Sequence, residues 1–376
     1  MKGGRYVNQP TFTFEEYCDD LGPIKIVHLH EPSCGLRGIV VIDNVACGPS
    51  IGGVRMAPDV STREVFRLAR AMTLKNAAAG LPHGGGKAGI VADPRTPDKA
   101  RLIRAFARAI RDLVEYIPGP DMGTDETCMG WIHDEIGRAV GLPRVLGGIP
   151  LDEIGATGYG LAECAEVAAP LCNLAIKGAA VAIEGFGNVG KHAAQFLEEK
   201  GARLVAASDS QGTIYDSAGI PVSALMEAKA ASGSVLGYAK GKKLGQAELF
   251  GLPCDILIPA ARPDCIHKDN VETIQAKLIL QGANISTTLE AETRLHQKGI
   301  LNIPDFIANA GGVICASVEY HGGNEVQAFQ EISQKIRRNT QEVLNRSKKE
   351  GVQPRQAAVD LARERVRHAM TFRACG

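Results

Sequence analysis

The segment of residues 179–201, AAVAIEGFGNVGKHAAQFLEEKG, decides the fold. Its start, Ala179–Glu184, is a largely apolar run typical of a buried strand, and an amphipathic helix is expected over Val189–Lys200. A second apolar run, Arg203–Ala207, predicts the next strand. Because a strand, a glycine-rich turn, a helix and a second strand form the βαβ unit that binds dinucleotides, the segment predicts a Rossmann-type domain.

The turn inside this unit carries the complete pattern GxGxxG. Its glycines let the backbone approach a pyrophosphate, and the N-terminus of the following helix offers unpaired N–H groups and a partial positive charge. We therefore expect a dinucleotide to bind here, in preference to a tight turn without a ligand. The cofactor-binding residues that the pattern predicts are Gly185, Phe186, Gly187, Asn188, Val189 and Gly190.

The choice between NAD and NADP stays open in the sequence. Asp209 follows the second strand, 19 residues after Gly190, where a carboxylate accepts hydrogen bonds from the adenosine ribose of NAD. The same aspartate could simply stabilise the turn in SDSQG. Lys229, or the lysines at 240, 242 and 243 (Lys240, Lys242 and Lys243), could instead bind the 2′-phosphate of NADP.

Outside this unit, short apolar runs alternate with helix-length amphipathic segments, the pattern of an α/β protein. Further strands are expected at Ile24–Leu29, Gly38–Ile42, Ala88–Ala92, Asp255–Ile258 and Lys277–Leu280. Further helices are expected at Arg63–Ala79, Pro97–Tyr116, Tyr159–Ala168 and Asn324–Glu350.

A boundary between two domains is predicted in the turn-rich segment Leu146–Gly155. Residues 1–150 would form a substrate and oligomerisation domain, and residues 151–323 a dinucleotide-binding domain. The helices of residues 324–376 are expected to pack back on the first domain.

Composition excludes several classes of protein. The 376 residues include 42 basic and 42 acidic side chains, and this zero net charge argues against a nucleic-acid partner. No run approaches the roughly 18 apolar residues of a membrane span, and the N-terminus lacks the apolar core of a signal peptide. The ten cysteines include no CxxC pair, and the histidines are dispersed. We therefore expect reduced thiols, a cytoplasmic location and no metal site.

Two lysines and one aspartate form a possible acid–base set. Lys75 lies on the apolar stripe of the expected helix Arg63–Ala79, where a lysine either extends to solvent or meets an anion. Lys87 follows three glycines in an expected turn, and is either exposed or held in a dry pocket that lowers its pKa. Asp121, in PGPDMGT, is either a turn former or the acid partner. Beside a dinucleotide fold, such a set favours hydride transfer.

Six motifs occur in the order seen in the glutamate/leucine/phenylalanine/valine dehydrogenases, and the chain resembles that family from about Ile24 to Tyr320. They are TLKNAAAGLPHGGGKAGI (73–90), GPDMGT (119–124), ATGYG (156–160), EGFGNVG (184–190), QGANISTT (281–288) and ANAGGV (308–313). The resemblance implies two α/β domains with the active site in the cleft, and reversible oxidative deamination of an L-α-amino acid by NAD or NADP. It also implies a small-molecule substrate and a homo-oligomer, either a hexamer or an octamer.

The resemblance also implies roles for individual residues. The family's lysine matching Lys75 holds the α-carboxylate of the substrate. The lysine matching Lys87 assists the water that attacks the imino carbon, and the aspartate matching Asp121 shuttles protons. Residues expected to help place the cofactor or the substrate are Thr157, Asn284 and Asn309.

The sequence departs from the glutamate enzymes where the substrate side chain is expected. Those enzymes resemble GP-x-K-GG over the segment that is Gly48–Gly53 here, so Ile51 replaces a lysine, and Ala316 replaces a serine. Both changes remove partners for a second carboxylate, whose unpaired burial is costly. We therefore expect a pocket with Ile51, Gly53 and Ala316 to favour an apolar amino acid such as leucine, valine or phenylalanine. Glutamate is the alternative, because the surrounding motifs look closer to the glutamate enzymes, and a non-catalytic dinucleotide-binding regulator is a further one.

Overall fold

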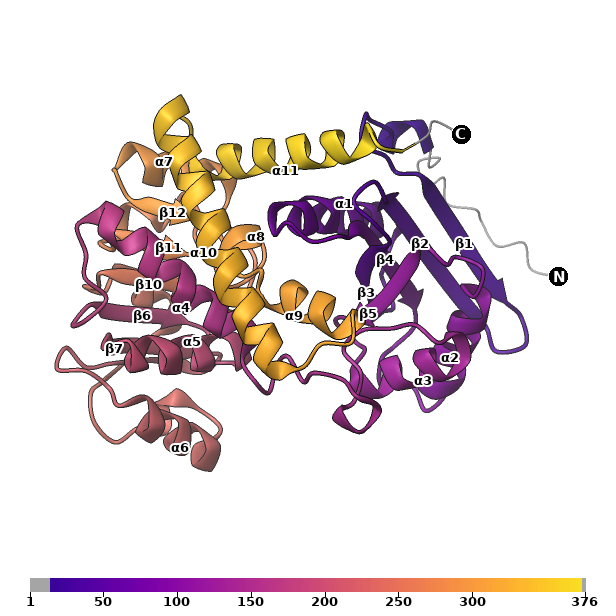
Figure 1. The fold of residues 1–376 in the computed structure, drawn as a ribbon. Helices are drawn as coiled ribbons and strands as arrows, with labels where there is room; N and C mark the ends of the chain where they lie inside the picture. The colour runs from indigo at the N-terminus through magenta and orange to yellow at the C-terminus, as the bar shows by residue number, and fades with distance from the viewer. Residues whose placement is uncertain (1–13, 374–376) are drawn as a thin grey trace, which may run out of the picture.

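Two β-sheets, each flanked by helices, make up the computed structural model, which describes residues 14–373 (Figure 1). The predicted α/β class with a Rossmann-type half is confirmed. The first sheet has five strands in the order β1-β2-β4-β3-β5, and the second has seven in the order β12-β11-β10-β6-β7-β8-β9. In the second sheet the five strands from β12 to β7 are parallel, as expected of a dinucleotide-binding sheet.

The first sheet comes from the N-terminal part of the chain. Its strands are β1 (Lys25–Glu31), β2 (Leu36–Asn44), β3 (Ser50–Ala57), β4 (Gly84–Val91) and β5 (Tyr116–Pro120). Its helices are α1 (Thr62–Ala78), α2 (Lys99–Ala109) and α3 (Glu126–Ile136). The strands β4, β3 and β5 lie parallel to one another, so the carboxyl ends of β4 and β5 lie on the same side of the sheet.

The second sheet contains the predicted βαβ unit. Its strands are β6 (Ala180–Glu184), β7 (Arg203–Asp209), β8 (Gly212–Tyr215), β9 (Lys242–Leu244), β10 (Ile256–Pro259), β11 (Leu278–Leu280) and β12 (Leu301–Ile303). Its helices are α4 (Ala156–Ala168), α5 (Asn188–Glu199), α6 (Val222–Ser232) and α7 (Leu289–Gln297).

Four C-terminal helices follow the second sheet: α8 (Asp305–Ala308), α9 (Gly311–Tyr320), α10 (Glu325–Glu350) and α11 (Pro354–Met370). The long helix α10 buries Ile332, Ile336 and Val343 on one face and packs against α4 and α9. Helix α11 extends from the second sheet across to α1 (Figure 1), where Arg365 donates hydrogen bonds to main-chain carbonyls. The division at residue 150 stays a prediction.

The three glycines before Lys87 are not in a turn, as the sequence suggested, but inside strand β4. A Cβ added at Gly84 would lie 1.8 Å from Asn44 O, and one at Gly85 would lie 2.0 Å from Thr73 N. The strand therefore runs so close to β2 and α1 that these two positions have no room for a side chain.

The helix expected over Pro97–Tyr116 is too long. Helix α2 ends at Ala109, and Tyr116 begins strand β5, which was not predicted from the sequence. The phenol of Tyr116 is fully buried and donates a hydrogen bond to Gly52 O at 2.8 Å. Strand β3 was missed as well, because Gly52 and Gly53 interrupt its apolar pattern.

The described residues 14–373 contain no helix that is both long and apolar enough to span a membrane.

Replacing Gly85 by alanine is expected to lower the free energy of unfolding by about 3 kcal/mol, because the added methyl group would overlap the backbone of α1. Gly130→Ala is the matched control, since an added methyl there lies 3.5 Å or more from its neighbours and α3 favours alanine over glycine. Urea unfolding followed by circular dichroism measures both variants. Equal stability of the two would contradict the close approach of β4 to α1.

Candidate active site

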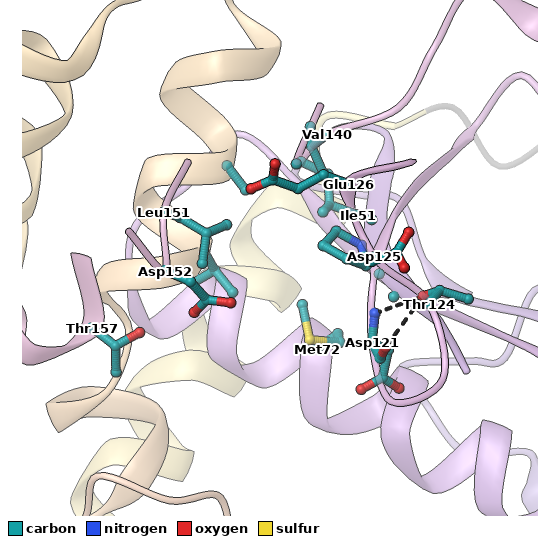
Figure 2. Close-up of a pocket in the computed structure, with 18 of the residues that line it drawn as sticks. Ile51, Met72, Asp121, Thr124, Asp125, Glu126, Val140, Leu151, Asp152 and Thr157 are labelled. Atoms are coloured by element: carbon teal, nitrogen blue, oxygen red, sulfur yellow. Dashed lines mark hydrogen bonds between the residues drawn. The ribbon is translucent and has the colours of Figure 1, made fainter. Parts of the chain in front are cut away.

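A cavity of about 740 Å³ lies between the two sheets and is lined from both sides. Lys75, Lys87 and Asp121 line it from the N-terminal half. The other half contributes the three residues expected to place the cofactor or substrate, namely Thr157, Asn284 and Asn309. In Figure 2, Thr157 faces the cavity from α4, across from Asp121. The structure thus brings the predicted acid–base set together with the cofactor side of the chain.

Lys87 and Asp121 form a buried ion pair. Lys87 Nζ lies 2.8 Å from Asp121 Oδ2, and Arg55 Nε donates to the same oxygen at 3.1 Å. Lys87 lies on β4, Arg55 on β3, and Asp121 directly after β5. Because β3 lies between β4 and β5, the parallel strands bring the three groups to one point.

Burial and pairing act in opposite directions on these groups. Burial lowers the pKa of Lys87, and the charge and hydrogen bond of Asp121 offset this only in part. Burial raises the pKa of Asp121, but the charges and hydrogen bonds of Lys87 and Arg55 outweigh it, so the net pKa is lowered. Asp121 is therefore ionised at neutral pH, and the Lys87 ammonium releases its proton more readily than that of a surface lysine.

Gly53 lies next to the ion pair of Lys87 and Asp121. A Cβ at this position would lie 2.8 Å from Asp121 Cβ and 3.0 Å from Lys87 Nζ. Only glycine leaves the ion pair in place. Arg55 was not predicted from the sequence, because no strand was expected there. It shares a face of β3 with Gly53. Every second residue of a strand lies on the same face, so counting from Gly53 would have identified Arg55.

Lys75 contacts the side-chain amides of two residues from the other half of the chain. Its Nζ donates to Asn309 Oδ1 at 2.6 Å and lies 3.5 Å from Asn284 Oδ1. Asn309 Nδ2 donates in turn to Asn284 Oδ1 at 3.0 Å and to Gly282 O at 3.2 Å. Burial lowers the pKa of Lys75 to about 8, although Asp305 raises it in part and Lys87 lowers it further. Lys75 is thus a cation in the cavity wall, held by neutral groups and free to pair with an anion.

The dinucleotide turn has the features that a pyrophosphate requires. Gly185 has φ +91°, and a Cβ at Gly190 would lie 2.1 Å from Gly185 O, so both positions require glycine. No atom lies within 4 Å of a Cβ built on Gly187. Helix α5 begins at Asn188 without a side-chain cap, which leaves its first N–H groups available to an anion. The side chain of Phe186 is buried, so that residue would contribute its backbone.

Asp209 already has three partners within the chain. Its carboxylate accepts hydrogen bonds from Gln211 N at 2.9 Å, Ser234 Oγ at 3.1 Å and Val235 N at 2.7 Å. These contacts favour the turn-forming alternative, and its contact with ribose stays a prediction. Lys229 lies 3.8 Å from this carboxylate and donates to Phe186 O at 2.7 Å.

The two positions singled out for substrate choice come together. Ile51 and Ala316 form one small buried apolar cluster with Ile117 and Val140. Ile51 and Val140 lie at the same end of the cavity (Figure 2). Among the described residues that line the cavity, Lys75 and Lys87 are the only lysines or arginines.

Within residues 14–373, no group of three or more His, Cys, Asp or Glu side chains is arranged to hold a metal ion. The nine cysteines in the described part of the chain are free thiols, and Cys375 lies outside it.

Comparison with known proteins identifies relatives over nearly the whole chain. The model of the family described as glutamate/leucine/phenylalanine/valine dehydrogenase matches residues 147–374, and that of its dimerisation domain matches residues 24–138. A glutamate dehydrogenase of Aeropyrum pernix is 41% identical over 355 residues, which cover 88% of this chain and 85% of the relative. The NADP(+)-dependent glutamate dehydrogenase of Pyrobaculum calidifontis is 37% identical, with 90% and 86% covered. An NAD-specific glutamate dehydrogenase of Staphylococcus aureus is 39% identical, with 78% and 75% covered.

Solved structures agree with this relationship. A hetero-hexameric glutamate dehydrogenase from Thermus thermophilus, in its Leu-bound form, superposes with a TM-score of 0.84 at 31% identity and covers 94% of this chain and 91% of its own. An L-tryptophan dehydrogenase from Nostoc punctiforme superposes with a TM-score of 0.74 at 27% identity, covering 93% and 98%.

The Lys75 ammonium is expected to lose its proton near pH 8 and not near 10.5, because burial disfavours its charged form. NMR titration of the protein with ¹³C-methylated lysines measures this, and the Lys75→Arg variant identifies the resonance by its absence. A Lys75 resonance that titrates together with those of exposed lysines such as Lys349 would contradict the burial of this ammonium.

Proposed function

Since this chain belongs to the glutamate/leucine/phenylalanine/valine dehydrogenase family, we propose that Lys75, Lys87 and Asp121 carry out the reversible oxidative deamination of an L-α-amino acid. The chain is an amino-acid dehydrogenase that uses NAD or NADP. This places it among enzymes and not among non-catalytic regulators. The observation that supports the residue roles is the meeting of two lysines and one carboxylate in a single cavity between the two sheets.

Lys75 is proposed to bind the α-carboxylate of the substrate. Its ammonium has only amide partners within hydrogen-bonding distance, Asn309 and Asn284, so its charge is not neutralised by direct contact with an acid. The α-carboxylate of a bound substrate would supply the negative charge that neutralises Lys75. The amide of Asn309, fixed by Gly282 O, holds the ammonium in position while the substrate is absent.

Lys87 and Asp121 are proposed to move protons. A bound NAD(P)+ would supply the acceptor for the hydride of the α-carbon, whose loss turns the amino acid into an imino acid. Lys87, after releasing its own proton to solvent, takes a proton from a water molecule, whose oxygen adds to the imino carbon. Asp121 accepts a proton from the α-ammonium of the substrate before the hydride leaves, and returns it to the departing nitrogen, so that ammonium and a 2-oxo acid are released. The lowered pKa of Lys87 suits it to accept that proton near neutral pH.

Replacing Lys87 by alanine is expected to lower kcat by about a thousandfold or more while leaving the affinity for NAD(P)H unchanged, since Lys87 lies away from the dinucleotide turn. Reduction of NAD(P)+ followed at 340 nm measures kcat, and quenching of NAD(P)H fluorescence measures binding. Lys349→Ala, an exposed lysine at the end of α10, is the matched control. Turnover retained in Lys87→Ala would remove this residue from the mechanism.

Glutamate is the substrate that the relatives favour. The proteins 37–41% identical to this chain are named glutamate dehydrogenases, which supports the alternative over the apolar substrate predicted from the sequence. We therefore propose glutamate as the first candidate.

An uncharged amino acid is a second candidate, because a specific feature of the cavity favours it. The apolar cluster of Ile51, Ile117, Val140 and Ala316 offers no cation to a second carboxylate. One solved neighbour with the same fold is named an L-tryptophan dehydrogenase. A panel of L-amino acids assayed with both cofactors separates the two candidates by their kcat/KM.

Replacing Ile51 by lysine is expected to raise kcat/KM for glutamate relative to leucine by about tenfold or more, because a charge-assisted contact replaces an apolar one. Ile51→Met is the matched control, since it changes shape without adding charge. Initial rates with both amino acids in the two variants give the ratio. An unchanged ratio in Ile51→Lys would show that the substrate side chain does not reach this cluster.

We also propose that the chain forms a homo-oligomer in the cytoplasm. The model that matches residues 24–138 is that of a dimerisation domain, and the Thermus thermophilus neighbour is named hetero-hexameric. Among the described residues, strand β1 forms one edge of the first sheet, and an edge strand suits pairing with a second copy. The free thiols of the described cysteines suit a reducing compartment.

A further inference from the structure

His83 forms a bridge between the two halves of the chain. It lies in the link between α1 and β4 and is 1% exposed. Its Nδ1 lies 3.2 Å from Pro49 O, and its Nε2 lies 3.1 Å from Ser317 Oγ. Pro49 precedes β3 in the first sheet, whereas Ser317 lies on α9, after the second sheet.

The partners of His83 determine its tautomer. The carbonyl of Pro49 can only accept a hydrogen bond, so Nδ1 carries the proton. Nε2 then has a free lone pair, which accepts the hydroxyl proton of Ser317. Burial lowers the pKa of His83 to about 4, with Pro49 O opposing and His321 adding to this shift, so the ring stays neutral near pH 7. The bridge is therefore intact at the pH of an ordinary assay.

The bridge ends beside the two residues that distinguish the substrate pocket. Pro49 is two residues before Ile51, and Ser317 directly follows Ala316. Ile51 and Ala316 belong to the same apolar cluster, one from each half of the chain. The two hydrogen bonds of His83 therefore connect the segment that carries Ile51 to the segment that carries Ala316.

We propose that His83 is a positioning residue that sets the distance between Ile51 and Ala316, and thereby the length of substrate side chain that the pocket accepts. This inference rests on the proposed function, since it concerns the same pocket. His83 does not line the cavity and touches no reacting group. It acts through Pro49 and Ser317.

Ser317→Ala is the sharpest test, because it removes one hydroxyl and leaves the imidazole with its bond to Pro49. The ratio of kcat/KM for the best amino acid to that for its homologue one methylene longer is expected to fall about fivefold, mainly through KM. The affinity for NAD(P)H is expected to stay unchanged. His83→Ala is expected to shift the ratio in the same direction, and His83→Gln to restore part of it through its side-chain amide.

The double variant of His83→Ala and Ser317→Ala is expected to match His83→Ala alone, since both changes remove one bridge. His321→Ala is the matched control: its ring centroid lies 5.2 Å from that of His83, but the bridge does not include it. An unchanged ratio in Ser317→Ala, additive effects in the double variant, or an equal effect of His321→Ala would overturn the proposal. If the wild type turned over no amino acid, the proposed function would fail, and this inference with it.

Discussion

The buried ion pair between the Lys87 ammonium and the Asp121 carboxylate is the contact on which the candidate site in the N-terminal half depends. A buried pair of charges is stable only when its geometry is good and its remaining hydrogen-bonding capacity is used. Arg55 supplies the additional hydrogen bond to Asp121, and Gly53 leaves the space that the pair occupies. The strand order β4-β3-β5 brings these three groups to one point.

The Rossmann-type half could be predicted almost entirely from the sequence. The apolar strand β6, the glycine pattern and the helix α5 are contiguous, and each is encoded by local periodicity. The N-terminal sheet was predicted less well. Strand β3 contains two glycines that serve contacts distant in sequence, such as the 1.6 Å that would separate a Cβ at Gly52 from Gly86 O. The strand propensity of a residue does not reveal a close contact with a residue that is distant in sequence.

The same distinction applies to the candidate site. Lys75 and Lys87 could be singled out because a lysine among apolar or glycine residues is unusual in itself. Arg55 was missed because the glycines of β3 interrupt the alternation that would have identified it. His83 could not be singled out, because its partners come near only in the folded chain. The substrate illustrates a further limit. The residues Ile51 and Ala316 describe a local pocket, whereas the names of relatives reflect similarity over the whole chain, and the two favour different amino acids.

The last turn of α1 and the residues after it receive additional hydrogen-bond donors from the C-terminal helices. Arg365 donates to the carbonyls of Ala77 and Ala78, and Lys335 donates to Gly80 O. Ala77 O also accepts a hydrogen bond from Gly80 N, whereas Arg365 is the donor to Ala78 O. These cations lie at the helix end that also carries Lys75, where positive charge is favourable. Arg365 follows every strand of both sheets in the chain. The end of α1 that carries Lys75 therefore acquires these donors only after both sheets have been synthesised.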